Sequence, residues 1–241
     1  METAQYLKTN HRDTDPVFKI PEPSLRRLPW YLSCVKLLNN RGEKFASSTQ
    51  IAKETGIDAS QIAKDLSYVR ISGRTRVGYE TEALIRVLED FLGFRHLHKA
   101  FLFGVGNLGG SLLHDGGLAQ FGMEIVAAFD VNRSLIGREL NGIPVYHIND
   151  FEELAARMQE VRIGILTVPI EVSQDITDRL VENGIRAVWN FTPVRIRVPE
   201  GIVVQNTSLY AHLAVMFNRL QSSQLQNHED IRMGEQLLPE Q

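Results

Sequence analysis

The chain has 241 residues, a net charge of −3 and a single cysteine, Cys34. Its length suits one large domain or two modest ones, and one cysteine excludes an internal disulfide and a cysteine-cluster metal site. No apolar run approaches the roughly 20 residues that a membrane span needs, so we expect a cytoplasmic protein with no membrane partner and no bound metal. Residues 1–95 carry a charge of +3 and the remainder −6, which indicates different partners for the two parts.

The N-terminal part of the chain predicts a helical domain. Residues 1–22 are polar and mixed in charge, and we expect them to form a flexible arm. Residues 23–92 are expected to form a winged helix-turn-helix domain. Its first helix should span residues 24–39, where apolar side chains recur at helical spacing.

Two short helices with clear start signals follow. Ser47 and Gln50 have the spacing of a capping box, which predicts that a helix begins after Ser47. Gly56 marks a tight turn, and Asp58 is suited to cap the next helix. Two capped helices joined by a glycine turn are typical of a helix-turn-helix.

The second helix of this pair, predicted over residues 59–70, has polar side chains opposite an apolar stripe. Such a face suits the base edges and phosphates of a major groove. The basic, glycine-flanked segment 71–79 is typical of a wing whose arginines meet phosphates or a minor groove. The candidate DNA-contacting residues are Ser60, Gln61, Lys64, Ser67, Tyr68, Arg74 and Arg76. A solvated helix face and a basic loop that bind no DNA remain the alternative.

A glycine-rich turn between two apolar runs is the strongest motif of the chain. The first run ends at Phe103 and leads into Gly104, Gly106 and Gly109, and the second ends on Asp130. The three glycines suit a tight turn, the approach of a pyrophosphate and close packing of a helix on a sheet, in that order. Asp130 is placed to bind an adenosine ribose and to repel a 2′-phosphate, which favours NAD over NADP. A tight turn that binds nothing is the alternative.

Alternating apolar strands and helices continue after this motif. They predict an α/β domain over residues 93–206, a Rossmann-like doubly wound parallel sheet that binds NAD(H). Ligands of such sheets lie beyond the carboxyl ends of the strands. The candidate cofactor-binding residues are Gly104, Val105, Gly106, Asn107, Leu108, Gly109, Asp130, Thr167, Val168, Pro169, Asn190, Phe191 and Pro193.

The C-terminal part predicts one further helix. Apolar residues recur at helical spacing over 209–220, within a segment 207–221 that we expect to form a dimerisation helix. Packing of this helix on its own sheet is an open alternative. Residues 222–241 are polar, and we expect them to be disordered.

The predicted nucleotide site lacks a group for proton transfer. A dehydrogenase needs an acid or a base beside the nicotinamide, and only His114, beside Asp115, and His147 lie near the motif. We therefore expect no catalytic residues and no enzyme. A nucleotide site joined to a DNA-binding domain indicates a sensor. An apolar pocket around Phe191 would disfavour the cationic ring of NAD⁺ and so favour neutral NADH.

Short strings spread over roughly residues 20–220 form a combined pattern. They are Arg27-Leu28-Pro29, Lys64 to Tyr68, Val77-Gly78-Tyr79, Gly104 to Gly109, Ala127 to Asp130, Gly142 to Val145, Leu166 to Pro169, Asp178 to Val181 and Asn190 to Pro193. This pattern resembles the Rex family of redox-sensing transcriptional repressors. The resemblance implies a homodimer that exchanges its C-terminal helices, binds double-stranded operator DNA with an inverted repeat when NADH is scarce, and releases it when NADH binds.

Some positions depart from the family pattern. The resemblance makes Asp115 and Ser208 switch or interface residues, where the family usually has a tyrosine reaching the partner's nicotinamide pocket and an aspartate starting the final helix. The family usually has arginine at Ala63, and glycine at Arg70 and Arg76. We expect the Asp115 carboxylate to weaken discrimination against NAD⁺, because a negative charge favours the pyridinium ring.

Two other classes of protein fit parts of the pattern. One is an NAD-dependent oxidoreductase whose first 80 residues are a dimerisation or lid module. The missing proton-transfer group and the basic wing argue against it. The other is a nucleotide-binding domain similar to the CoA-binding part of succinyl-CoA synthetase. Asp130 fits a ribose in either kind of site, so it does not distinguish the two.

Overall fold

The computed structural model describes residues 20–235, with side chains as far as residue 222. The chain divides between Arg95 and His96 into two compact units, which are described separately. Most of the predicted N-terminal arm, residues 1–19, lies outside the described residues. No helix of the described range is both long and apolar enough to cross a membrane.

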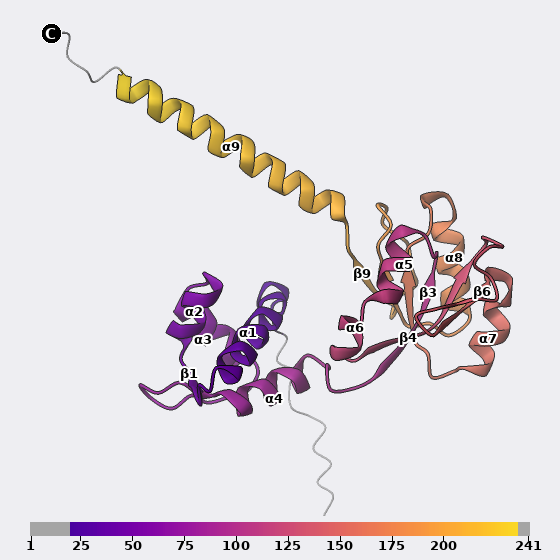
Figure 1. Cartoon of the computed structure of the whole chain (residues 1–241), viewed down its shortest axis with the longest axis horizontal. Coiled ribbons are helices and arrows are strands. Elements are labelled where there is room, and N and C mark those ends of the chain that lie inside the picture. The colour runs from indigo at the N-terminus through magenta and orange to yellow at the C-terminus, as the bar shows by residue number, and fades with distance from the viewer. Residues whose placement is uncertain (1–19, 236–241) are drawn as a thin grey trace, which may run out of the picture. The chain divides into compact units, whose positions relative to one another are not determined.

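The first unit is a small helical domain (Figure 1). Its elements are α1 (Glu22–Asn40), β1 (Phe45–Ala46), α2 (Ser48–Thr55), α3 (Ala59–Ser67), β2 (Tyr79–Glu80) and α4 (Thr81–Phe91). The short strands pair in antiparallel fashion. Its fully buried core includes Leu28, Ile51, Ile62, Leu66 and Leu84, so all four helices contribute apolar side chains to one interior.

The start signals of the helix-turn-helix are confirmed. Gln50 N–H donates to Ser47 Oγ at 3.1 Å and Ser47 N–H to Gln50 Oε1 at 2.9 Å, a complete capping box. Gly56 ends α2 with a φ of +70°, and Asp58 Oδ1 accepts from Ser60 N–H at 2.8 Å at the start of α3. These contacts fix the two helices and the turn between them.

Two helix boundaries differ from the sequence prediction. Helix α1 begins at Glu22, inside the predicted arm, because Pro21 and Pro23 favour the start of a helix while Glu22 adds an acidic first turn. Helix α3 ends at Ser67 rather than at Arg70. Arg70 has a φ of +55°, a left-handed conformation that a right-handed helix cannot continue through.

The second unit is built on a seven-stranded sheet (Figure 1). Its strands, in the order β5-β6-β4-β3-β7-β8-β9, are all parallel except for the antiparallel pair β5–β6. They are β3 (His98–Phe103), β4 (Met123–Asp130), β5 (Glu139–Leu140), β6 (Ile143–His147), β7 (Ile163–Leu166), β8 (Ala187–Asn190) and β9 (Val203–Asn206). The predicted doubly wound parallel sheet is confirmed, and the short edge strand β5 was not predicted.

Helices cover both faces of this sheet. They are α5 (Asn107–His114), α6 (Gly117–Gln120), a 3₁₀ turn η1 (Ile148–Asp150), α7 (Phe151–Arg157) and α8 (Ile170–Glu182). One face buries Phe101, Phe103 and Phe129 with Phe151 of α7, and their rings lie 5.0–6.0 Å apart. The other face buries a smaller aliphatic cluster that includes Leu113 of α5. Phe129 of this aromatic cluster precedes Asp130, so packing of the cluster fixes the end of β4 where Asp130 lies.

The C-terminal helix α9 (Leu209–Glu235) is longer than predicted. It extends through residues 222–235, which were expected to be disordered, because no glycine or proline interrupts the chain from Leu209 to Met233. Residues 236–241 of the predicted tail lie outside the described range. Apolar side chains at the start of α9 are exposed in the described chain: Leu213 and Phe217 are 41% and 53% exposed.

Candidate functional sites

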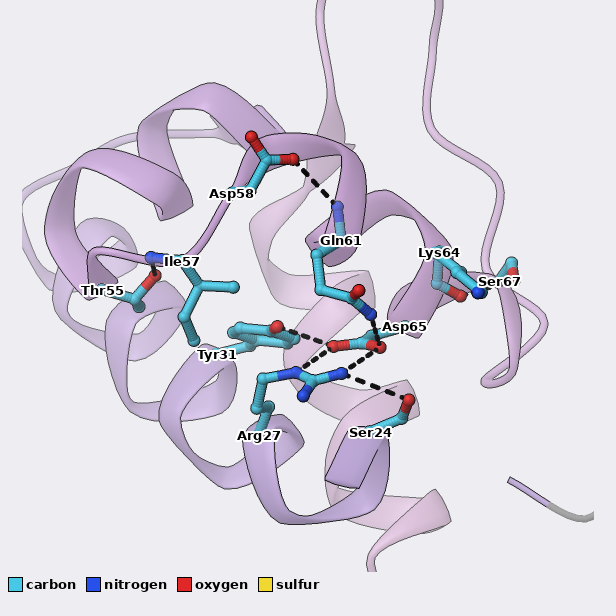
Figure 2. A network of polar contacts seen from close by, with 10 residues as sticks. All are labelled: Ser24, Arg27, Tyr31, Thr55, Ile57, Asp58, Gln61, Lys64, Asp65 and Ser67. Carbon is cyan, nitrogen blue, oxygen red and sulfur yellow. Dashed lines mark hydrogen bonds and ion pairs between the residues drawn. The ribbon is translucent and has the colours of Figure 1, made fainter. Parts of the chain in front are cut away.

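A buried carboxylate anchors the third helix to the first (Figure 2). Asp65 of α3 accepts four hydrogen bonds, from Arg27 Nε at 2.6 Å, Arg27 Nη2 at 2.9 Å, Tyr31 Oη at 2.8 Å and Gln61 Nε2 at 2.8 Å. A carboxylate offers about four lone-pair sites, so its accepting capacity is filled. Asp65 is fully buried, and this network therefore fixes how α3 sits on α1.

The network keeps Asp65 ionised. Burial alone would raise the pKa of this carboxyl, but the hydrogen bonds from Arg27, Tyr31 and Gln61 outweigh it and lower the pKa to about 2. Burial, reinforced by Asp65, raises the pKa of Tyr31. Asp65 is thus a permanent acceptor near neutral pH, and each of its partners must present a donor to it.

The outward side of α3 carries most of the predicted DNA-contacting residues. Ser60, Lys64 and Ser67 are exposed, and Gln61 and Tyr68 are half-buried. The hydroxyls are used within the helix, since Ser60 Oγ donates to Asp58 Oδ1 at 2.5 Å and Ser67 Oγ to the Lys64 carbonyl at 2.6 Å. Their remaining capacity is as acceptors.

The predicted wing is a tight loop between α3 and β2. Arg74 and Gly78 face each other across it, with Arg74 N–H donating to the Gly78 carbonyl at 2.8 Å. A side chain at Gly78 would collide with the backbone of Ala46, so the loop lies directly on β1. The Arg74 guanidinium lies 5.2 Å from the centre of the Phe45 ring, a cation–π contact. Arg76 is exposed at the loop tip with a φ of +65°.

The glycines of the nucleotide motif have different roles in the second unit. Gly104 has a φ of +90°, and a Cβ there would lie 2.7 Å from the Thr167 carbonyl oxygen. A Cβ at Gly109 would collide with the carbonyl oxygen of Gly104. A Cβ at Gly106 would meet nothing within 4 Å. The protein's own packing thus requires the first and third glycines but not Gly106, which leaves open space at the start of α5.

Asp130 is held against this turn at the end of β4. Its Oδ2 accepts from Val105 N–H at 2.5 Å, and its Oδ1 accepts from Asn132 N–H at 2.7 Å. Two backbone donors fix the carboxylate where β4 ends. Each oxygen retains a lone pair that can accept from a hydroxyl group.

A cavity of about 390 Å³ lies beside the turn. It brings together six of the predicted cofactor-binding residues, namely Gly104, Gly106, Asp130, Thr167, Val168 and Pro169. The sequence prediction missed the rest of its lining, which is Phe129, Val131, Ile148, Val172 and Ile176. Apart from Phe129, which ends the apolar run before Asp130, no motif marks these residues, because apolar side chains in strands, turns and helices are usually assigned to the core. The apolar wall suits a flat ring system, while Asp130 supplies the polar anchor.

The other predicted cofactor-binding residues do not line this cavity. They are Val105, Asn107, Leu108, Gly109, Asn190, Phe191 and Pro193. Asn190 is fully buried and serves the fold: its Nδ2 donates to Val194 O and Asn206 Oδ1, and its Oδ1 accepts from Thr192. The Thr167 hydroxyl also faces inward, 2.7 Å from the Gly104 carbonyl. Thr167 and Asn190 therefore stabilise the ends of neighbouring strands through hydrogen bonds.

Phe191 and the two predicted switch residues lie elsewhere in the unit. The Phe191 ring packs on Trp189 with centroids 4.6 Å apart. Asp115 follows α5, accepts from Gly117 N–H at 2.8 Å and lines a second cavity of about 410 Å³. Ser208 precedes α9 and accepts from Ala211 N–H at 3.2 Å, as a helix cap. No group of three His, Cys, Asp or Glu side chains that could hold a metal occurs among the described residues.

A helix-turn-helix unit and a dinucleotide-type sheet on one chain define a ligand-responsive DNA-binding regulator. Residues 19–67 match the family model of a putative DNA-binding protein N-terminus, and residues 96–194 that of a CoA binding domain. The chain is 70% identical over 218 residues to the redox-sensing transcriptional repressor Rex of Bacteroides fragilis, covering 90% of this chain and 96% of that protein. It belongs to the Rex family of redox-sensing transcriptional repressors.

Further comparisons agree with this family. The Rex repressor of Porphyromonas gingivalis is 61% identical over 204 residues, which cover 85% of this chain and 93% of that protein. A crystal structure of RSP in complex with beta-NAD⁺ and operator DNA is 30% identical, with a TM-score of 0.81, and covers 88% of this chain and 97% of that one. RSP in complex with beta-NADH gives a TM-score of 0.78. The predicted family and regulatory, non-enzymatic class are confirmed.

Proposed function

We propose that this protein represses transcription as a homodimer that binds operator DNA through α3 and the wing and leaves it when NADH binds the second unit. One observation carries the proposal. A single chain holds an anchored helix-turn-helix and a glycine turn with Asp130, and it matches along 87–88% of its length solved structures of RSP with operator DNA and with NADH. We place the protein in the cytoplasm, where its DNA would be.

The first unit supplies the surface for DNA. Lys64, Arg74 and Arg76 offer cations beside the polar side of α3, and the three are exposed. Cations on such a surface bind phosphates and make affinity fall with salt. Lys64→Ala should weaken binding to all duplexes alike and flatten the salt dependence. A loss confined to one base position would contradict a phosphate role for Lys64.

The second unit supplies the NAD(H) site. The open space at Gly106 lets phosphate oxygens approach the backbone N–H groups at the start of α5. Asp130 would accept from the adenosine ribose, and the apolar cavity wall would cover a ring. The bound coenzyme supplies a nicotinamide ring whose charge depends on its oxidation state. Thr167 and Asn190 would contribute indirectly, because their hydrogen bonds fix the ends of the strands that border the site. Val168, Pro169, Phe191 and Pro193 follow these strand ends and would contribute through their position there.

The exposed apolar residues of α9 supply the dimer contact. Leu209, Leu213, Met216, Phe217 and Leu220 are all 41% exposed or more. An apolar surface of this kind on a single helix is stabilised when a second chain covers it. We propose that α9 of each chain packs on the other chain, and sedimentation of Phe217→Glu against the unchanged protein tests this.

Duplex binding measured with and without coenzyme tests the proposal as a whole. Fluorescence anisotropy with genomic fragments should show binding without NADH and a loss of affinity of tenfold or more with it. Since coupling between two ligands is reciprocal, the operator should weaken NADH binding by the same factor. A protein that ignored every duplex, or that steadily oxidised NADH with a metabolite, would instead fit the oxidoreductase alternative.

A further inference from the structure

The orientation of one side-chain amide on α3 is fixed by the network that anchors the helix. Gln61 lies one turn before Asp65, and its Nε2 donates to Asp65 Oδ1 at 2.8 Å (Figure 2). The reversed amide would place Oε1 against an ionised carboxylate that has no proton to give. Asp65 therefore dictates which end of the amide faces inward.

This constraint leaves Gln61 with a defined remaining capacity. A glutamine amide has two N–H donors and one carbonyl acceptor, and Asp65 takes one donor. One N–H and the carbonyl remain, and the proposal has Asp65 taking the N–H that points away from the carbonyl, so that the remaining two lie side by side on one edge of the amide. In the major groove, adenine presents an N6 donor beside an N7 acceptor, whereas guanine presents two acceptors, N7 and O6. The remaining edge of Gln61 matches adenine and leaves guanine O6 facing a carbonyl.

We propose that Gln61 is a specificity-determining residue that reads one adenine in each operator half-site, and that Asp65 is the positioning residue that sets its selectivity. This inference rests on the proposed binding of operator DNA by α3. The neighbouring hydroxyls do not compete as donors, because Ser60 donates to Asp58 and Ser67 to the Lys64 carbonyl. Gln61 is thus the amide side chain on this side of α3, and it has both a donor and an acceptor to offer.

Base-by-base binding profiles of the full-length protein test the assignment. Duplexes would first be selected from a random pool, and each base pair of the selected site would then be replaced in turn. For the unchanged protein, replacing one adenine per half-site by guanine or by 7-deazaadenine, which lacks N7, should weaken binding roughly 5- to 100-fold. Gln61→Ala should lose this preference at that position and keep the rest of the profile.

Two further variants separate the roles of the residues. Lys64→Ala, on the same helix, should weaken binding evenly and leave the adenine preference intact. Asp65→Asn lets the Gln61 amide turn over, so the preference for adenine over guanine should shrink at that position alone. Where Asp65→Asn fails to fold, as circular dichroism would report, the Gln61→Ala profile still decides.

The outcomes are distinguishable. A Gln61→Ala profile identical to that of the unchanged protein overturns the assignment while leaving the proposed function standing. Failure of the unchanged protein to select any duplex overturns the proposed function itself. A Gln61→Ala variant that binds all duplexes uniformly more weakly, with the adenine preference retained, also refutes base reading by Gln61.

Discussion

Arg27 and Asp65, 38 residues apart, form a two-pronged ion pair that joins α1 to the proposed recognition helix α3. The Asp65 side chain is fully buried, while the Arg27 side chain is 22% exposed. The hydrogen bonds to Asp65 raise the pKa of Arg27, so both groups are charged near neutral pH. Removing one partner of a buried ion pair leaves an uncompensated charge in the interior, which is strongly destabilising.

Removal of the arginine should therefore destabilise the first unit. Arg27→Ala is expected to lower the free energy of unfolding by about 3–5 kcal/mol. The fluorescence of Trp30 during urea unfolding, in a Trp189→Phe background, reports on this unit alone because the chain has two tryptophans. The matched control is Arg26→Ala, since Arg26 makes an exposed pair with Glu22 that should contribute about 1 kcal/mol or less. Equal losses in both variants would contradict the anchoring role.

Acid should weaken the same unit over a defined pH window. The pKa of Asp65 is lowered to about 2 in the folded protein, against about 4 for an unfolded aspartate. Its stabilisation is therefore fully present above pH ~4 and is lost as the pH falls through ~2, a change of about 3 kcal/mol.

A single hydroxyl makes this dependence testable. Tyr31→Phe removes one donor to Asp65, so the folded-state pKa should rise and acid unfolding, followed by Trp30 fluorescence, should begin at a higher pH. The carboxyl resonance of Asp65, titrated by NMR, gives the pKa directly. An unchanged acid midpoint in Tyr31→Phe would show that Asp65 does not govern the transition.

Local signals in the sequence predicted the parts of the molecule that local chemistry determines. The capping box at Ser47, the turn at Gly56 and the glycine motif before Asp130 are each complete within a short stretch, so spacing alone identifies them. The Arg27–Asp65 pair joins residues 38 positions apart and has no spacing rule. The buried role of Asn190 was not predicted either, because its hydrogen bonds to Val194 and Asn206 follow no recognised spacing motif.

The wing contains an arginine in a strained backbone conformation, and its effect on folding stability can be separated from its effect on DNA binding. Arg76 has a φ of +65°, a conformation that costs a non-glycine residue about 1–2 kcal/mol. Arg76→Gly should raise the free energy of unfolding of the first unit by about 1 kcal/mol. Arg76→Ala keeps the strain and removes the same charge. Both variants should lower the affinity for DNA and reduce the salt dependence of that affinity to the same extent. In urea unfolding, only Arg76→Gly should raise the free energy of unfolding.

Substitutions in the glycine motif should distinguish a role in folding from a role in coenzyme binding. Gly106→Ala adds a Cβ that meets no protein atom, so the stability of the second unit should change by about 1 kcal/mol or less. The methyl group would occupy the space proposed for the pyrophosphate, and NADH affinity measured by calorimetry should fall at least tenfold. Gly104→Ala, in contrast, forces a left-handed alanine against the Thr167 carbonyl and should destabilise the unit. NADH binding unaffected by Gly106→Ala would place the coenzyme elsewhere.

The redox preference should depend on the charge at Asp115. The family position implies that this carboxylate approaches the nicotinamide of the partner chain, where it would favour the NAD⁺ ring by about 1 kcal/mol in a partly solvated site. Asp115→Asn removes the charge but retains an Oδ1 acceptor for Gly117 N–H. Calorimetric titration with both coenzymes should show roughly fivefold weaker NAD⁺ binding and unchanged NADH binding. Asp175→Asn, an exposed neutralisation on α8, is the matched control. An NADH preference of a hundredfold or more in the unchanged protein would refute this role for Asp115.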